Sequence, residues 1–193
     1  NQFAECEVAG TPGKRVTLVV RMVSSVEKPV SRFVLITSPL RKGSTSSLAA
    51  FAGELGVDSI ILAPMMRSVA KVVDTDSLEH LRRAARDGAR GVAQTNVPTI
   101  ETASSLDDAV SRANTPLLLF GLEDADQELG ALVPPSISGV AVVIGPEGGF
   151  DPSETAAMRA RGVVPFRMNG PHYRAETASM LVSAIVLHRL GRI

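Results

Sequence analysis

The sequence predicts an α/β protein whose sheet is mostly parallel, with helices on both faces. From about residue 32 onward, short apolar runs alternate with stretches of helical periodicity. Strands that are separated by helices join in parallel, because each connection has to cross back over the sheet. The clearest strand is the β-branched run 140–144, which ends in a glycine-rich loop and is followed at once by a helix start at Pro152.

The first thirty residues have a different pattern. Two short runs at 3–9 and 15–24 flank the turn 10–13, which places a proline between two glycines. They predict a β-hairpin, and residues 27–29 predict a linker. Because a lone hairpin is only marginally stable in water, it is expected to be the remnant or the visible end of a small β domain.

The alternating part of the chain can be divided into strands and helices in order. Strands are expected at 33–37, 57–62, 97–100, 116–120, 140–144 and 163–168. Helices are expected at 44–55, 76–93, 106–112, 152–161 and 174–190.

The last of these helices is apolar nearly all round, since it carries Met180, Leu181, Val182, Ile185 and Val186. A surface helix of a monomer shows one polar side. The helix is therefore either internal or shared with a partner, and its terminal position favours the second.

Composition excludes several classes of protein. The 45% of hydrophobic residues supports a proper core, and 20 basic residues balance 20 acidic ones. This balance argues against binding to nucleic acid by bulk charge alone and leaves a local basic patch open. Cys6 is the only cysteine, and His80 and His188 lack partners at metal spacing, so neither a disulfide nor a metal site is expected. No signal peptide is recognised, and no apolar run approaches the ~20 residues that span a bilayer.

The loop Gly145-Pro-Glu-Gly-Gly149 is the strongest candidate for a ligand site. It joins a buried strand to a helix that Asp151 and Glu154 can cap as a capping box. Its spacing is neither that of a P-loop nor that of a dinucleotide-binding loop. Glu147 disfavours a phosphate ligand and tolerates a cationic or hydroxyl-bearing one, and it is expected to fix the loop by accepting backbone N–H groups. The alternative is an ordinary tight turn.

Several motifs in order resemble one family. They are the glycine loop, the strand at 163–168, the stretch Asn169 to Ala178, and upstream Glu54-Leu-Gly-Val57, Arg67-Ser-Val69 and Val97-Pro-Thr-Ile100. Together they resemble the ribosomal RNA small-subunit methyltransferase E family, uridine-N3 methyltransferases of the SPOUT superfamily. The resemblance covers roughly residues 33–190.

The resemblance implies a C-terminal trefoil knot in a SPOUT domain at 32–193, preceded at 1–31 by part of a PUA-like β domain. It implies S-adenosylmethionine as the cofactor, bent between three loops. Carried over by position, the cofactor-binding residues are Phe120, Gly121, Leu122, Ile144, Gly145, Pro146, Glu147, Gly148, Gly149, Met168, Asn169, Gly170 and Tyr173.

Methyl transfer to uracil N3 requires positioning of the base and loss of the N3 proton. Arg174 is the candidate to orient the base or hold a phosphate, with a surface arginine as the alternative. Glu176 and Thr177 are expected to close the pocket or cap the helix. His172 and Tyr173 stand where the family has Ile-Leu, and His172 is a candidate to handle the proton.

RNA contacts are expected from Arg67, Lys71, Arg86 and Arg90, whose alternative role is a solvated surface. Two functions stay open. The first is an active uridine-N3 methyltransferase acting on small-subunit rRNA; the second is a catalytically weak homologue that acts in ribosome assembly. A homodimer through the C-terminal helix, no membrane association and a bacterial cytoplasmic location are expected. Because the chain opens with Asn1, a processed mitochondrial form is the alternative location.

Overall fold

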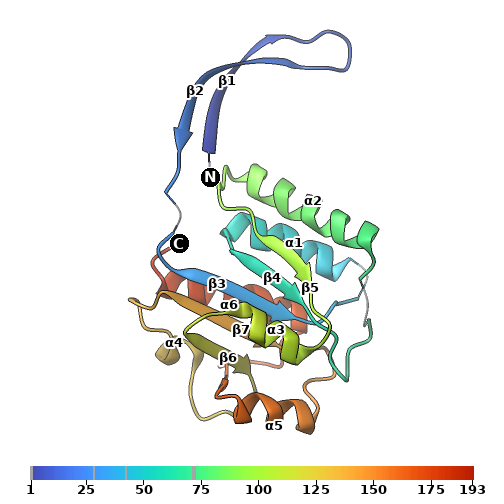
Figure 1. Cartoon of the computed structure of the whole chain (residues 1–193), viewed down its shortest axis with the longest axis vertical. Coiled ribbons are helices and arrows are strands. Elements are labelled where there is room, and N and C mark those ends of the chain that lie inside the picture. The colour runs from blue at the N-terminus through green and yellow to red at the C-terminus, as the bar shows by residue number, and fades with distance from the viewer. Residues whose placement is uncertain (1, 28, 42, 71–72) are drawn as a thin grey trace.

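A computed structural model describes residues 2–27, 29–41, 43–70 and 73–193 of the chain. It consists of an α/β body from which a hairpin stands away (Figure 1). The strands are β1 (Gln2–Gly10), β2 (Thr17–Ser25), β3 (Arg32–Thr37), β4 (Ser59–Leu62), β5 (Thr99–Thr102), β6 (Leu117–Gly121), β7 (Gly139–Ile144) and β8 (Val164–Phe166). The helices are α1 (Ser44–Leu55), α2 (Thr75–Gly91), α3 (Leu106–Ala113), α4 (Leu129–Leu132), α5 (Pro152–Ala160) and α6 (Ala175–Arg189).

The body is built on a parallel sheet of strand order β5-β4-β3-β7-β6-β8. Parallel strands bring their carboxyl ends to one edge of the sheet, where ligands of α/β proteins bind. Since β6 lies between β7 and β8, the loops that follow these three strands begin side by side. The parallel sheet expected from the sequence is confirmed.

Helices cover both faces of the sheet, and the alternation of side chains along β3 shows how. Phe33 and Leu35 join one apolar cluster with residues of α1, α2 and α6, and Val34 and Ile36 join another with residues of α3 and α5. Figure 1 accordingly shows α3 in front of the sheet and α6 behind it. All four side chains are 0% exposed, so the central strand is buried on both faces.

Helices α1 and α2 pack with their backbones in contact. A Cβ atom on Gly53 would lie 2.1 Å from the Ala85 carbonyl oxygen, and one on Gly88 would lie 2.1 Å from the carbonyl oxygen of Ala50. No side chain fits at either position unless the helices move apart. The pair of glycines therefore fixes the distance at which α2 lies over α1.

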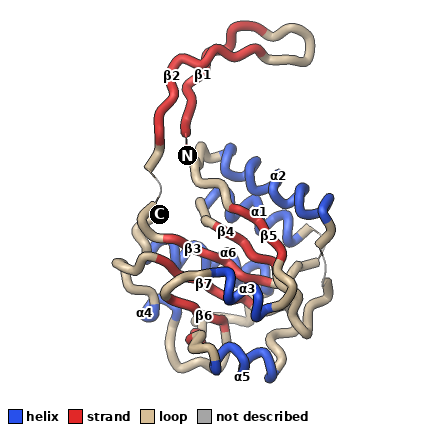
Figure 2. Tube along the Cα trace, in the orientation of Figure 1, coloured by secondary structure: helices blue, strands red, loops and turns tan. Residues whose placement is uncertain are grey.

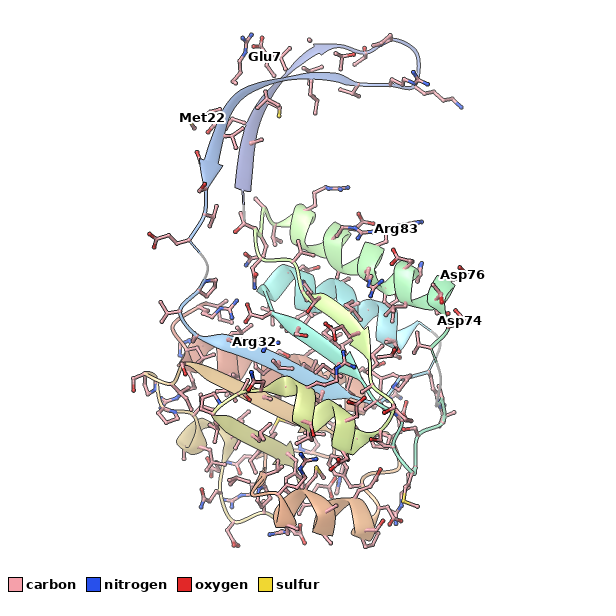
Figure 3. All side chains as sticks on the ribbon, viewed as in Figure 1. Glu7, Met22, Arg32, Asp74, Asp76 and Arg83 are labelled. Atoms are coloured by element: carbon pink, nitrogen blue, oxygen red, sulfur yellow. The ribbon has the colours of Figure 1, made fainter. Side chains whose placement is uncertain are left out.

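The expected hairpin is confirmed as the antiparallel pair β1–β2, which extends beyond the body (Figure 2). Val8, Leu18, Val20 and Val23 are each between 54% and 58% exposed. Figure 3 shows side chains along the hairpin standing clear of the body. An exposed group of apolar side chains of this kind is typical of an interface.

Strands β4 and β8 are shorter than the expected ranges 57–62 and 163–168, and two further details differ from the sequence expectation. Strand β5 begins at Thr99 rather than at residue 97, because Pro98 has no N–H for the ladder and Thr99 donates the first bond, to the Asp58 carbonyl, at 3.0 Å. The short helix α4 was not expected at all. Its Leu129 is buried, and Arg189 of α6 donates to the neighbouring Val133 carbonyl at 3.2 Å.

The apolar C-terminal helix is largely internal. Val182, Val186 and Leu187 are 0% exposed, whereas Leu181 and Ile185 each keep 37% exposure on the outer side. Internal packing thus accounts for most of its apolar surface, and sharing with a partner stays a prediction. Within the described ranges, no helix is both long and apolar enough to cross a bilayer. Nor do three or more His, Cys, Asp or Glu side chains gather there in a way that could hold a metal ion.

Candidate functional site

The carboxyl edge of β7, β6 and β8 brings the expected cofactor loops together. We name them the β6 loop (122–128), the glycine loop (145–151) and the β8 loop (167–174). Gly121, at the end of β6, joins them, because a Cβ there would lie 3.3 Å from Ile144 Cδ1 and 3.5 Å from Phe166 Cζ. Ends of three strands that are separate in the sequence therefore meet around one glycine.

The β6 loop and the β8 loop are held together by main-chain hydrogen bonds. The Leu122 N–H donates to the Phe166 carbonyl at 2.8 Å, and the Arg167 N–H donates to the Gln127 carbonyl at 2.8 Å. The Arg167 guanidinium adds a bond to the Ala125 carbonyl at 3.1 Å. These contacts place the chain that leaves β8 against the β6–β7 connection. The trefoil knot implied by the resemblance stays a prediction.

The glycine loop is a tight turn built onto an aromatic pair. The Gly149 N–H donates to the Pro146 carbonyl at 2.8 Å, and Gly149 has a φ of +70°, which favours glycine. Gly145 lies against Phe150, whose ring packs edge-on to Phe120 at 5.9 Å between centroids. The loop thus combines a tight turn with main-chain groups that no Cβ covers.

The helix after the glycine loop starts as the sequence predicts. Asp151 accepts from the Ser153 N–H at 3.0 Å, and Glu154 accepts from the Asp151 N–H at 3.0 Å, which completes the capping box. Hydrogen bonds from the hydroxyl and the N–H of Ser153 hold the pKa of Asp151 below its usual value. Glu154 also accepts from the Met66 N–H at 2.8 Å, so the cap ties the loop after β4 to α5.

Glu147 does not have the expected role. Its side chain is exposed, and in the described part of the chain no backbone N–H donates to its carboxylate. The turn closes through main-chain atoms instead, as the bond from Gly149 to Pro146 shows. Glu147 is therefore available to a ligand.

Arg67 lies against the glycine loop. Its guanidinium is 3.4 Å from the Gly148 carbonyl and 3.6 Å from the Asp151 carboxylate, and a Cβ on Gly148 would lie 3.1 Å from Arg67 Cβ. Arg67 thus supports the loop that the sequence expects to bind the cofactor. Its side chain is still 48% exposed, so the guanidinium stays accessible to solvent beside the loop.

The start of α6 carries the expected catalytic residues. Arg174 occupies the N-cap position, is exposed and makes no side-chain capping bond; Glu176 and Thr177 are half-buried in the first turn. The expectation that Thr177 caps the helix is wrong, because the helix begins before it. The N-terminal end of a helix favours an anion such as the Glu176 carboxylate.

The β8 loop leads into this helix start. Met168 is half-buried against the core and Asn169 is exposed. Gly170 has a φ of +132°, and Tyr173 lies so close to it that a Cβ would come 2.6 Å from the Tyr173 hydroxyl. His172 Nδ1 lies 2.6 Å from Glu123 Oε1 of the β6 loop. No local pattern in the sequence predicts this contact, because the two residues are 49 positions apart.

The remaining RNA candidates lie elsewhere. Arg86 and Arg90 are exposed on α2, which lies at the opposite end of the body from α5 (Figure 1). Arg83 is exposed on the same helix (Figure 3), whereas the Arg82 guanidinium donates to the Ile100 carbonyl at 3.1 Å. Lys71 lies outside the described residues. The structure therefore brings Arg67, but not Arg86 or Arg90, to the loop cluster.

A groove of about 450 Å³, not expected from the sequence, runs beside this cluster between the loop after β4, α3 and α5. Met65, Leu106, Val110 and Met158 form an apolar lining. Helical periodicity shows only that these residues face inward, and it does not distinguish a filled core from an open groove.

Comparison with solved structures first shows the fold, which is shared with solved methyltransferases. A Legionella pneumophila methyltransferase solved with bound SAM has a TM-score of 0.86 at 20% identity over 97% of this chain and 79% of its own. A ribosomal RNA small subunit methyltransferase E from Neisseria gonorrhoeae, solved bound to S-adenosyl methionine, has a TM-score of 0.77 at 18% identity, covering 96% of this chain and 77% of its own.

The sequence then defines the family. Residues 26–187 match the RNA methyltransferase domain, and the chain belongs to that family. It is also similar to the ribosomal RNA small subunit methyltransferase E of Mycobacterium bovis and of Mycobacterium tuberculosis, each 28% identical over 198 residues, with 96% of this chain and 74% of the relative covered. The resemblance read from the motifs is confirmed.

Proposed function

We propose that this RNA methyltransferase transfers a methyl group from S-adenosylmethionine to N3 of a uridine in small-subunit rRNA. The observation that carries the proposal is the meeting of the β6, glycine and β8 loops around Gly121 at the carboxyl edge of the sheet. The rRNA specificity named for the mycobacterial relatives supports the choice of substrate.

The residues of these loops fit the cofactor. Gly148 and Gly149 are exposed and have no Cβ, so main-chain N–H and C=O groups stay within reach of a ligand. Leu122 and Tyr173 offer apolar surface, and the free Glu147 carboxylate suits a cationic or hydroxyl-bearing ligand better than a phosphate. When bound, S-adenosylmethionine supplies the methyl group on its sulfonium sulfur. The two SAM-bound structural neighbours support the same choice.

The start of α6 is the place for the chemistry of the substrate. Arg174 presents an exposed, permanently charged donor fork, which orients the uracil or holds a phosphate. Transfer to N3 requires removal of the N3 proton, and Glu176 and His172 are the groups beside Arg174 that can accept one.

A second surface would bind the rest of the RNA. Arg83, Arg86 and Arg90 follow one side of α2 at spacings of three and four residues. Arg83 and Arg86 have no carboxylate partner within the described residues, and Arg90 pairs with Asp87 at 3.4 Å. Together with Arg67 at the loops, these arginines would contact phosphates. Each contact would steepen the fall of log affinity with log salt concentration by roughly 0.7–0.9.

The assembly follows from two exposed apolar surfaces. Leu181 and Ile185, on the outer side of α6, would pack against a second copy of the chain. The apolar side chains of the β1–β2 hairpin would pack within a PUA-like β domain at 1–31, next to the knotted SPOUT domain at 32–193. Since the relatives named above are mycobacterial, we favour the cytoplasm of a bacterium over the mitochondrion.

Calorimetry with S-adenosylmethionine, followed by methyl transfer to small-subunit rRNA and mass spectrometry of the digested product, tests the proposal. We expect binding and 3-methyluridine. Absence of cofactor binding would overturn the enzyme. Binding without transfer would support the alternative, a catalytically weak homologue in ribosome assembly. Full turnover by Arg174→Ala, matched by Arg112→Ala on α3 as the control, would remove the role of Arg174.

A further inference from the structure

The contact between Glu123 and His172 differs from the other bonds between the β6 and β8 loops. The main-chain bonds at Leu122 and Arg167 lie directly at the end of β8 and fix only the beginning of the β8 loop. Beyond Arg167, His172 Nδ1 lies 2.6 Å from Glu123 Oε1. Among the described residues, this is the one hydrogen bond that ties residues 168–173 to the β6 loop. The far half of the β8 loop thus depends on one side-chain pair.

This half of the loop needs such a restraint. Gly170 adopts a φ of +132°, and Asn169 to Arg174 are all exposed. Exposed chain with few packing contacts opens at low free-energy cost. Without the pair, residues 168–173 would sample many conformations, and a ligand would have to order them on binding.

We propose that Glu123 is a positioning residue that holds His172 and thereby keeps the β8 loop closed against the β6 loop in the arrangement that receives the cofactor. The proposal rests on the proposed function, because it takes S-adenosylmethionine as the ligand of these loops. An imidazole with a proton on Nδ1 donates to the carboxylate whether or not Nε2 is also protonated, so the pair forms with either charge state of His172.

The pair acts on cofactor affinity, and Glu123 itself takes no part in the chemical step. Removing either partner releases the same loop, so the losses from Glu123→Ala and His172→Ala are expected to be equal and not additive. Both side chains are largely exposed, at 75% and 84%, which limits the effect to about two- to five-fold in Kd.

Calorimetry with S-adenosylmethionine on the full chain measures this. We expect Glu123→Ala, His172→Ala and the double variant to weaken binding alike, and the exchange of the two residues (Glu123→His with His172→Glu) to restore it. In Glu123→Ala, which keeps His172, kcat at saturating cofactor should stay unchanged. His80→Ala, an exposed histidine on α2, is the control and should bind as the wild type does.

The outcomes separate the two proposals. Wild-type binding with unchanged Kd in both single variants would overturn the positioning role alone. A fall in kcat at unchanged Kd in Glu123→Ala would also overturn it, because the pair would then act in proton transfer by His172. Failure of the exchange to restore affinity would show that each residue acts separately. No binding by the wild type would overturn the proposed function together with this inference.

Discussion

Arg192, three residues beyond the end of α6, is expected to contribute more to stability than any exposed arginine. Its side chain is 9% exposed and pairs with Asp58, 18% exposed, at the start of β4. Its guanidinium also donates to the carbonyls of Gly56 and Ser31. The substitution Arg192→Ala would leave the Asp58 carboxylate and these carbonyls without this donor at a site with little access to water.

The cost can be bounded from these contacts. Removing one partner of a buried ion pair costs roughly 3–5 kcal/mol. Asp58 keeps two other donors, the Phe33 N–H at 2.7 Å and Asn96 Nδ2 at 2.7 Å, so we expect a smaller cost, about 2–4 kcal/mol. At roughly 2–4 °C per kcal/mol for a chain of this size, Tm would fall by about 4–16 °C.

Urea and thermal unfolding followed by circular dichroism would measure this loss. Arg161→Ala is the matched control, because Arg161 pairs with Asp107 in the open, at 37% and 73% exposure, and should cost no more than about 1 kcal/mol. A double-mutant cycle with Asp58→Ala should give a coupling energy above that of the control pair. Equal losses in Arg192→Ala and Arg161→Ala would refute the reasoning.

Three further predictions concern the packing, the cap and the site. Gly88→Val should lower the free energy of unfolding in urea by about 1–3 kcal/mol, because a Cβ there cannot fit against α1. Gly91→Ala is the control and should not destabilise the fold, because the space around Gly91 is open. Equal effects of the two substitutions would contradict this packing. Since Ser153 lowers the pKa of Asp151, the Asp151 carboxylate stabilises the fold above about pH 4, and this stabilisation is lost as the pH falls through the lowered pKa. Asp151→Asn should keep the cap and make the stability depend less on pH in this acidic range. An unchanged pH dependence of stability would argue against this role of Asp151. Gly121→Val should abolish S-adenosylmethionine binding in calorimetry while circular dichroism stays native, and retained affinity would place the cofactor elsewhere.

The sequence predicted best the elements whose signals are local. Helix α1 has the bounds expected for it, and the cap of α5 has the expected hydrogen bonds, because N-cap chemistry depends on neighbouring residues alone. The sequence missed α4, which has four residues and depends on its contacts with α6. A helix that short has no periodicity to detect and is unstable without tertiary support.

The site was predictable only in part, for a related reason. Each loop was visible as a glycine-bearing segment, but their meeting depends on the strand order β7-β6-β8, which no local pattern encodes. The resemblance to a family supplied the meeting of the three loops, and the structure supplied the strand order behind it. The resemblance did not supply the pair of Glu123 with His172, since His172 stands where the family has an apolar residue, and it did not supply the pair of Arg192 with Asp58, 134 positions apart.

These two pairs restrain the chain at both ends of α6. The chain is tied to the β6 loop just before α6 begins, and to the start of β4 just after α6 ends. Between these points the helix is buried against the sheet through Val182, Val186 and Leu187, so it is held along its whole length. The first tie is exposed and weak, and the second is buried and strong. Motion of the helix is therefore expected to concentrate at its Arg174 end, next to the β8 loop, while the Arg192 end keeps the helix in register with the sheet.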